Sequence, residues 1–219
     1  MIGIALLTLV PGEMGGSESA TSGLLQALAR SGTLPYRVYL PPAAPDAHEG
    51  LPYEVVSDYR RAQSRLERLA ALGLATLRPE PLRRRLRSAD VVHYPFTIRV
   101  PSVEALSVVT LHDLQHIDLP QLFSRAERAF RSVYYHRSAR AAARVVVPST
   151  FVRVGAVGQL GIDPSRLALT TRLNGQVAQE ARTDDMIFSV GALIEYCSAF
   201  TPLHPGDVII TGTTGGVGA

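Results

Sequence analysis

The sequence has no lysine, a single cysteine and no long hydrophobic run. One cysteine, Cys197, excludes a disulfide framework within the chain and is typical of a reducing compartment, so we expect a cytoplasmic protein. The apolar residues 2–10 end at Pro11-Gly12, too early for a membrane span or a signal peptide. The absence of lysine makes every one of the 22 basic residues an arginine, a bias typical of a GC-rich coding sequence.

Charge is unevenly distributed along the 219 residues. Residues 1–171 carry a net positive charge and residues 172–219 a net negative charge. Nine arginines and two glutamates lie within residues 60–87. This segment is either a solvated helix face or a surface that meets anionic lipid or a phosphorylated ligand. Nucleic acid is not expected as a partner, because no aromatic residue beyond Tyr59 accompanies these arginines.

Residues 108–116 organise the first three quarters of the chain. An apolar, β-branched run ends at His112-Asp113, which predicts a buried strand with polar groups at its carboxyl end, the edge where open parallel sheets bind ligands. Alternating strands and helices predict an α/β fold: a Rossmann-like parallel sheet with helices on both faces, followed by a small β-rich C-terminal fragment. Further strands are expected at 2–10, 36–40, 53–56, 89–94 and 144–147, and helices at 17–30, 60–77, 81–87, 124–142 and 150–160.

A glycine-rich loop follows the first predicted strand. Gly15 and Gly16 precede a helix for which Ser17 is the expected N-cap and Gly32 the expected end. Exposed amides at a helix N-terminus can hold phosphate or sugar hydroxyls, although a tight turn without a ligand explains the glycines equally well. The dinucleotide fingerprint G-x-G-x-x-G is absent.

Four segments occur in an order that resembles the N-terminal lobe of GT-B glycosyltransferases, closest to the family 4 retaining enzymes. They are Gly15-Gly16, residues 90–93 (DVVH), residues 110–116 (TLHDLQH) and residues 146–152 (VVPSTFV). The resemblance covers residues 1–167. It implies a Rossmann-like lobe that binds a sugar or a lipid-linked acceptor.

The same resemblance assigns roles to five residues. It implies that His112 is catalytic, in the cleft against the donor sugar. Gly15 and Gly16 would lie beside the donor diphosphate, and His93 and Asp113 would help to bind donor or acceptor.

A purely structural explanation stays open for each histidine. His112 could be a histidine hydrogen-bonded at a strand end. His93 and His116 have no evident chemical partner, and His136 lies in an arginine-rich helix where we expect it to be exposed.

A GT-B enzyme also needs a second Rossmann-like lobe, which binds the nucleotide-sugar donor. Only about fifty residues follow residue 167, and they contain no Glu-x7-Glu motif. We therefore expect no cofactor bound by this chain itself. Hexosyl transfer from a nucleotide sugar would require a separately supplied donor lobe.

The last fifty residues resemble another family, the C-terminal part of the fumarylacetoacetate hydrolases. The resemblance rests on residues 173–179 (LNGQVAQ), 183–188 (TDDMIF) and 203–213 (LHPGDVIITGT), and it covers residues 170–219. It implies cleavage, decarboxylation or isomerisation of diketo acids with Mg²⁺ or Ca²⁺. It also places Thr213 on a substrate loop, although Thr214 stands where the family usually has proline.

The residues of this segment carry local signals of their own. Asn174-Gly175 predicts a hairpin turn, Ser189 is an expected N-cap for a helix to residue 199, and a strand is expected at 207–211. Asp184-Asp185 is expected to be a solvated loop. No metal site is predicted within the chain, because residues 1–170 contain no Glu-x-Glu cluster that could complete one.

Three hypotheses for function follow. The chain is a glycosyltransferase acceptor lobe without its donor lobe, a metal-dependent hydrolase or isomerase of diketo acids completed by a partner, or a joined or truncated product without activity. Under the last hypothesis, two originally separate sequences are joined near residues 167–172. The sequence does not indicate an oligomeric state.

Overall fold

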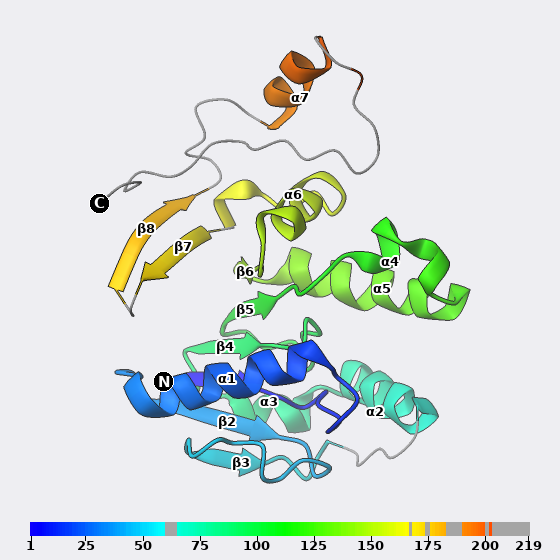
Figure 1. Ribbon diagram of the computed structural model, residues 1–219. Helices are drawn as coiled ribbons and strands as arrows, with labels where there is room; N and C mark the ends of the chain where they lie inside the picture. The colour runs from blue at the N-terminus through cyan, green and yellow to red at the C-terminus, as the bar shows by residue number, and fades with distance from the viewer. Residues whose placement is uncertain (60–64, 167, 174–175, 183–189, 200–201, 203–219) are drawn as a thin grey trace. The chain divides into compact units, whose positions relative to one another are not determined.

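The computed structural model describes residues 1–59, 65–166, 168–173, 176–182, 190–199 and 202. The chain divides into two compact units, Met1–Ile162 and Asp163–Ala219. The first unit contains, in chain order, β1 (Ile2–Ala5), α1 (Gly16–Ser31), β2 (Tyr36–Leu40), β3 (Tyr53–Val55), α2 (Arg65–Leu77), α3 (Glu80–Leu86), β4 (Val91–Tyr94), β5 (Leu106–Thr110), α4 (Gln115–Asp118), the 3-10 turn η1 (Pro120–Leu122), α5 (Arg125–Ala141), β6 (Arg144–Val146) and α6 (Thr150–Gly158) (Figure 1).

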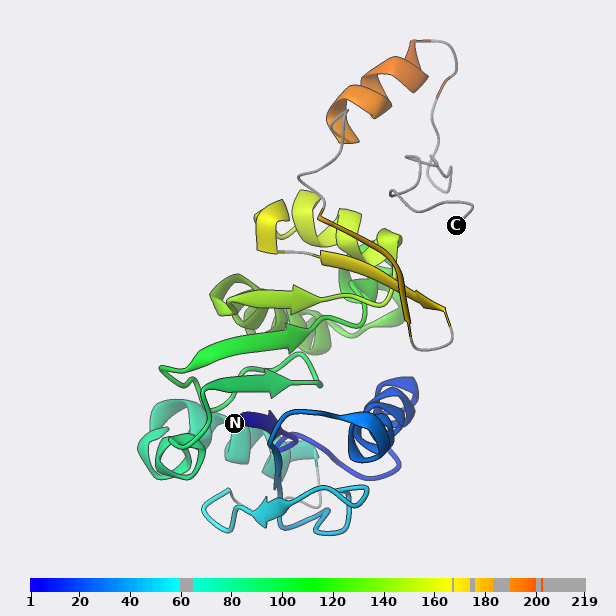
Figure 2. The same cartoon turned by 90° about the vertical axis from the view of Figure 1, so that its left-hand side faces the viewer.

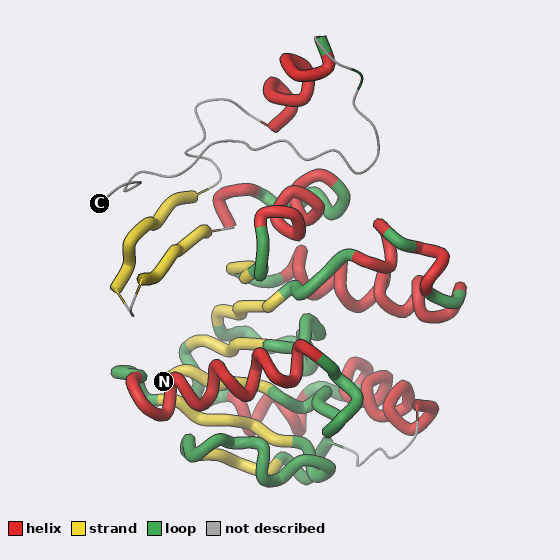
Figure 3. The backbone as a smooth tube through the Cα atoms, viewed as in Figure 1, coloured by secondary structure: helices red, strands yellow, loops and turns green. Residues whose placement is uncertain are grey.

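Six parallel strands form the sheet of the first unit, in the order β3-β2-β1-β4-β5-β6 (Figure 3). The chain moves outward from β1 to β3 and then returns to the other side of β1 as β4. Helix α1 covers one face, whereas α2 and α3 cover the other, as the two perpendicular views show (Figure 1, Figure 2). The predicted α/β class and parallel sheet are confirmed, and the strand order reverses between β1 and β4.

The inner strands bury apolar side chains because helices cover the sheet. Ile4, Val38 and Leu40 are at most 1% exposed and belong to one hydrophobic cluster. Leu25 of α1 packs into the same cluster. Such strands have nearly continuous apolar sequences, which is why the sequence pattern located β2, β4 and β6 within a few residues.

The first strand is shorter than predicted. It ends at Ala5, and the chain then turns, with the amide of Leu9 donating to the carbonyl of Leu6 at 2.8 Å. Residues 6, 7 and 9 are nevertheless buried. An apolar run that is buried as a turn gives the same hydrophobic signal as a buried strand.

The start of α5 agrees with the sequence to within one residue, whereas the N-cap of α1 differs. Ser124 forms the full capping box with Glu127 at α5. At α1 the predicted N-cap Ser17 is wrong, because the helix starts after Gly15, whose φ of 55° lets the chain turn into the helix earlier. The Ser17 hydroxyl instead donates to the carbonyl of Met14 at 2.7 Å. The predicted end at Gly32 is confirmed.

The second unit is described in part. Strands β7 and β8 pair antiparallel with Leu173 opposite Gln176, which confirms the predicted hairpin; its turn residues, Asn174-Gly175, lie outside the described residues. Ser189 and the strand predicted at 207–211 also lie outside them, and a β-rich fragment is therefore not established. The elements of this unit are the 3-10 turn η2 (Pro164–Arg166), β7 (Ala168–Leu173), β8 (Gln176–Arg182) and α7 (Val190–Ser198).

No helix in the described ranges is both long enough and apolar enough to span a bilayer.

Two adjacent leucines of α1 provide a test of this core. Leu25 is 1% exposed, whereas Leu24 is 36% exposed. We expect Leu25→Ala to lower the free energy of unfolding by about 2–5 kcal/mol, because it leaves a cavity between α1 and the sheet. Leu24→Ala is the matched control and should cost less than about 1 kcal/mol. Urea unfolding measures both values, and equal losses would contradict the packing described here.

Candidate functional site

The carboxyl ends of β4 and β5 bring His93 and Thr110 together. Because the two strands are hydrogen-bonded neighbours, Nε2 of His93 lies 2.8 Å from Oγ1 of Thr110. The hydroxyl of Thr97 donates to the carbonyl of Thr110 at 2.7 Å. Burial lowers the pKa of His93 to about 4, with a smaller contribution from the charge of His112. His93 is therefore a neutral, partnered side chain at pH 7, and its proposed lack of a partner is wrong.

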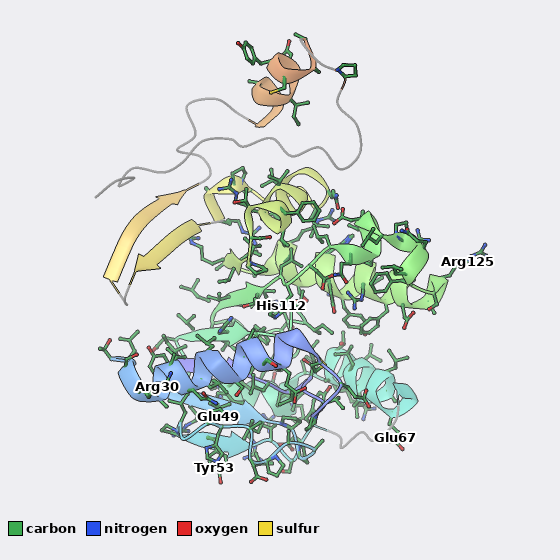
Figure 4. The ribbon with its side chains drawn as sticks, in the orientation of Figure 1. Arg30, Glu49, Tyr53, Glu67, His112 and Arg125 are labelled. Carbon is green, nitrogen blue, oxygen red and sulfur yellow. The ribbon has the colours of Figure 1, made fainter. Side chains whose placement is uncertain are left out.

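His112 lies just after β5, at the same edge of the sheet (Figure 4). Its Nε2 is 2.7 Å from the carbonyl oxygen of Pro95. A carbonyl only accepts hydrogen bonds, so Nε2 carries the proton and, in the neutral ring, Nδ1 carries the lone pair. The ring is only half-buried. This is the hydrogen bond expected of a strand-end histidine, and the catalytic role of His112 stays a prediction.

Asp113 is occupied by intramolecular contacts. Its Oδ1 accepts from Nη1 of Arg131 at 3.2 Å and from the backbone amide of Gln115 at 3.1 Å. The guanidinium of Arg131 also lies over the rings of Phe123 and Tyr135. Asp113 thus anchors the start of α4 against α5, and ligand binding by this residue stays a prediction.

The glycine-rich loop is closed by a carboxylate from the helix that follows it. Both carboxylate oxygens of Glu18 accept from the amide of Gly12, at 3.0 and 3.1 Å, and one accepts from the amide of Met14 at 3.4 Å. A side-chain anion therefore occupies amides that the sequence suggested for phosphate. Gly15 and Gly16 are the N-cap and the first residue of α1, and their binding roles stay predictions.

A histidine pair between α4 and α5 was not predicted. Nε2 of His116 lies 3.1 Å from Nε2 of His136, and His116 is 2% exposed. Burial is the main cause that lowers the pKa of both rings; the charge of His136 adds to it for His116, and that of Arg140 for His136. The expectations of an unpartnered His116 and an exposed His136 are wrong. Twenty residues separate the two, so only the packing of α4 on α5 reveals their contact.

The described residues do not form a metal site. Nowhere in the described ranges do three or more His, Cys, Asp or Glu side chains converge as ligands of one ion. Asp184, Asp185 and Thr213, which the sequence singled out, lie outside those ranges.

Comparison with known families gives one match. The family described as "Fumarylacetoacetate (FAA) hydrolase C-terminal" matches residues 110–219. The match begins at the last residue of β5, includes His112 and Asp113, and continues through the second unit.

Individual relatives share shorter stretches with the chain. An uncharacterized protein of Pyrococcus abyssi is 46% identical over 71 residues, which is 32% of either chain. A maleylpyruvate hydrolase of Aquipseudomonas alcaligenes is 51% identical over 55 residues, 25% of this chain and 19% of the relative. The mitochondrial oxaloacetate tautomerase FAHD2A of Bos taurus is 46% identical over 56 residues, 26% of this chain and 18% of the relative. The chain thus matches about a third or less of the length of these relatives.

These matches overturn the glycosyltransferase interpretation. Two of the four segments on which the GT-B resemblance rested, residues 110–116 and 146–152, lie within the hydrolase-family match. The physical reason for the error is that the remaining signals, a glycine-rich turn and polar residues after buried strands, describe the carboxyl edge of any doubly wound sheet. That edge hosts many unrelated chemistries, so it specifies a fold and no particular substrate.

The lowered pKa of His93 predicts a pH-dependent stability. An unfolded histidine has a pKa near 6.5. Between pH 6.5 and about 4, His93 is therefore protonated in the unfolded chain and neutral in the folded chain. The free energy of unfolding should therefore fall with pH across this window, by about 1–2 kcal/mol at pH 5 because solvent screens the partly exposed ring. Urea unfolding at pH 7.5 and 5 measures the loss. His93→Asn should lose about 1–2 kcal/mol less than the wild type over that interval, and an identical loss in both proteins would contradict the assignment.

Proposed function

This chain belongs to the fumarylacetoacetate hydrolase family, and on that premise we propose that it takes part in the hydrolysis or tautomerisation of oxo acids. The observation that carries the proposal is the match of residues 110–219 to the family. The names of two relatives, a maleylpyruvate hydrolase and an oxaloacetate tautomerase, support the substrate class. Both named substrates are dicarboxylic acids with a carbonyl beside a carboxylate.

Both reactions require a group that takes up and returns a proton. Tautomerisation moves a proton between a carbon and the neighbouring carbonyl oxygen, and hydrolysis removes one from the attacking water. His112 is our candidate for this group, because its Nε2 is held by the carbonyl of Pro95 and its Nδ1 carries the lone pair. The hydrogen bond also sets the direction of the ring at the carboxyl edge of the sheet.

Members of this family are typically metal-dependent, and Mg²⁺ would polarise the substrate carbonyl when bound. The described part of the chain brings no three potential ligands together. These residues therefore do not fit such an ion, and the proton transfer proposed for His112 does not involve it.

Thr213 is proposed to contact the substrate. The segment Gly212-Thr213 ends the stretch that resembles the family, and a threonine hydroxyl can donate to a substrate carboxylate. We further propose that residues 170–219 form the part of the chain that supplies this loop.

Turnover of oxaloacetate and maleylpyruvate tests the proposed function. With Mg²⁺ present, the full chain should accelerate enol–keto conversion of oxaloacetate or hydrolysis of maleylpyruvate above the rate of Mg²⁺ in buffer. Thr213→Ala should lower kcat/KM about tenfold, since it removes one hydrogen bond to the substrate. Thr150→Ala, at the exposed start of α6, is the control and should leave the rate unchanged. Absorbance assays follow both reactions, and rates no higher than Mg²⁺ alone for both substrates would reject the proposal.

A second variant tests the base. His112→Gln should lower kcat by about 100-fold or more, because it removes a general base. His48→Gln is the matched control, since His48 stacks on Tyr53 of β3, which is separated from β5 by three strands. A wild-type kcat in His112→Gln would exclude His112 as the base while leaving the substrate assignment intact.

A further inference from the structure

A hollow of about 490 Å³ lies beside the histidine pair, on the exposed side of α5. Its size is within the range of small-molecule sites. Segments from α4 to α5 form its wall, so the site lies entirely in the first unit. The lining residues are His116, Ile117, Pro120, Arg125, Arg128, Ala129 and Ser132.

Two arginines bring positive charge to this hollow. Arg125 and Arg128 are three residues apart on α5 and therefore lie on neighbouring turns of one face. Asp113 neutralises Arg131 farther along α5, and Glu127, which precedes Arg128, closes the capping box with Ser124. Figure 4 shows Arg125 at the outer end of α5, directed away from the sheet. Arg125 is also one of the residues that line the hollow.

One ring nitrogen of His116, which lines the hollow, is buried without a hydrogen-bond partner among the described residues. Nδ1 of His116 is buried and has no hydrogen-bond partner among the described residues, although a buried polar nitrogen normally has one. The ring of His116 contacts the ring of His136 through Nε2 and meets the edge of Tyr135. When His116 donates to His136 through Nε2, Nδ1 of His116 carries the lone pair that can take up a proton.

The charged groups around the pair oppose its protonation in the ligand-free protein. Burial lowers the pKa of His116 most, and the charges of His136 and Arg131 lower it further. Asp113 and Asp118 raise it. His136 faces Arg140, which lowers its pKa further. A bound anion would offset these cations and favour the protonated pair.

We propose that this hollow binds a phosphate monoester group, held by Arg128 and Ser132 and covered by Arg125, and that binding draws a proton onto the His116–His136 pair. Two guanidinium groups match the two negative charges of a phosphate monoester, and the hydroxyl of Ser132 can donate to a third oxygen. The site is separate from His112 and from the proposed oxo-acid chemistry.

The phosphate could come from a soluble metabolite or from a lipid headgroup. Leu119 and Leu122 are 41% and 67% exposed and flank the hollow at η1, where they would meet the acyl boundary of a membrane. The chemistry of the bound group is the same in both cases.

Calorimetric titration of the full chain with inorganic phosphate tests the site. We expect Arg128→Gln to weaken binding at least tenfold, because it removes a direct ligand. Arg30→Gln is the matched control, since Arg30 is an exposed arginine in the last turn of α1 and removes the same charge. It should leave the affinity unchanged. Absence of binding, or equal weakening in both variants, would overturn the site.

Proton uptake and vesicle binding complete the test. Titrations at pH 7 in buffers of different ionisation enthalpy should show more proton uptake with phosphate in the wild type than in His116→Asn, because this comparison cancels the proton exchange of phosphate itself. Equal net proton exchange in the two proteins would overturn the role of the histidine pair. Phosphatidylcholine vesicles with and without phosphatidic acid identify the source: retention by phosphatidic acid that Arg128→Gln abolishes indicates a lipid headgroup, and phosphate binding without retention indicates a soluble ligand.

Discussion

Parallel hydrogen bonding of β1 to β2 on one side and to β4 on the other determines where the polar groups of the first unit lie. Because every strand of this sheet runs the same way, all carboxyl ends meet at one edge. The glycine-rich loop after β1, His93 at the end of β4 and His112 after β5 therefore share that edge. The strand order reverses between β1 and β4, the position where open sheets of this kind hold ligands.

The same side chain serves in three different environments around this edge. His93 is held by a threonine hydroxyl in dense surroundings, which keep it neutral. His112 is tethered to a carbonyl and half-exposed, so its second nitrogen is available. His116 is buried against another imidazole, in the wall of a hollow lined by Arg125 and Arg128. Burial and neighbouring charge, rather than residue type, separate a structural histidine from a candidate base and from a proton acceptor.

Family membership and fold provide different information in this chain. The hydrolase-family match starts at the end of β5 and crosses from the first unit into the second. The sheet has a strand order common to many doubly wound folds. The sugar-transfer interpretation came from four short sequence segments that follow or connect such strands. The correction came from the family match over residues 110–219, which includes two of the segments on which the sugar-transfer interpretation rested. Residues that must be apolar for packing carry little information about substrate.

The sequence alone was sufficient for the α/β class, for the limits of β2, and for the starts of α5 and α6, because these signals act over a few positions. It also identified the hydrolase family through residues 170–219. It could not reveal the closure of the glycine-rich loop by Glu18, the ion pair of Asp113 with Arg131 or the contact of His116 with His136. These contacts join residues 6 to 20 positions apart, and only the path of the folded chain decides which of them meet.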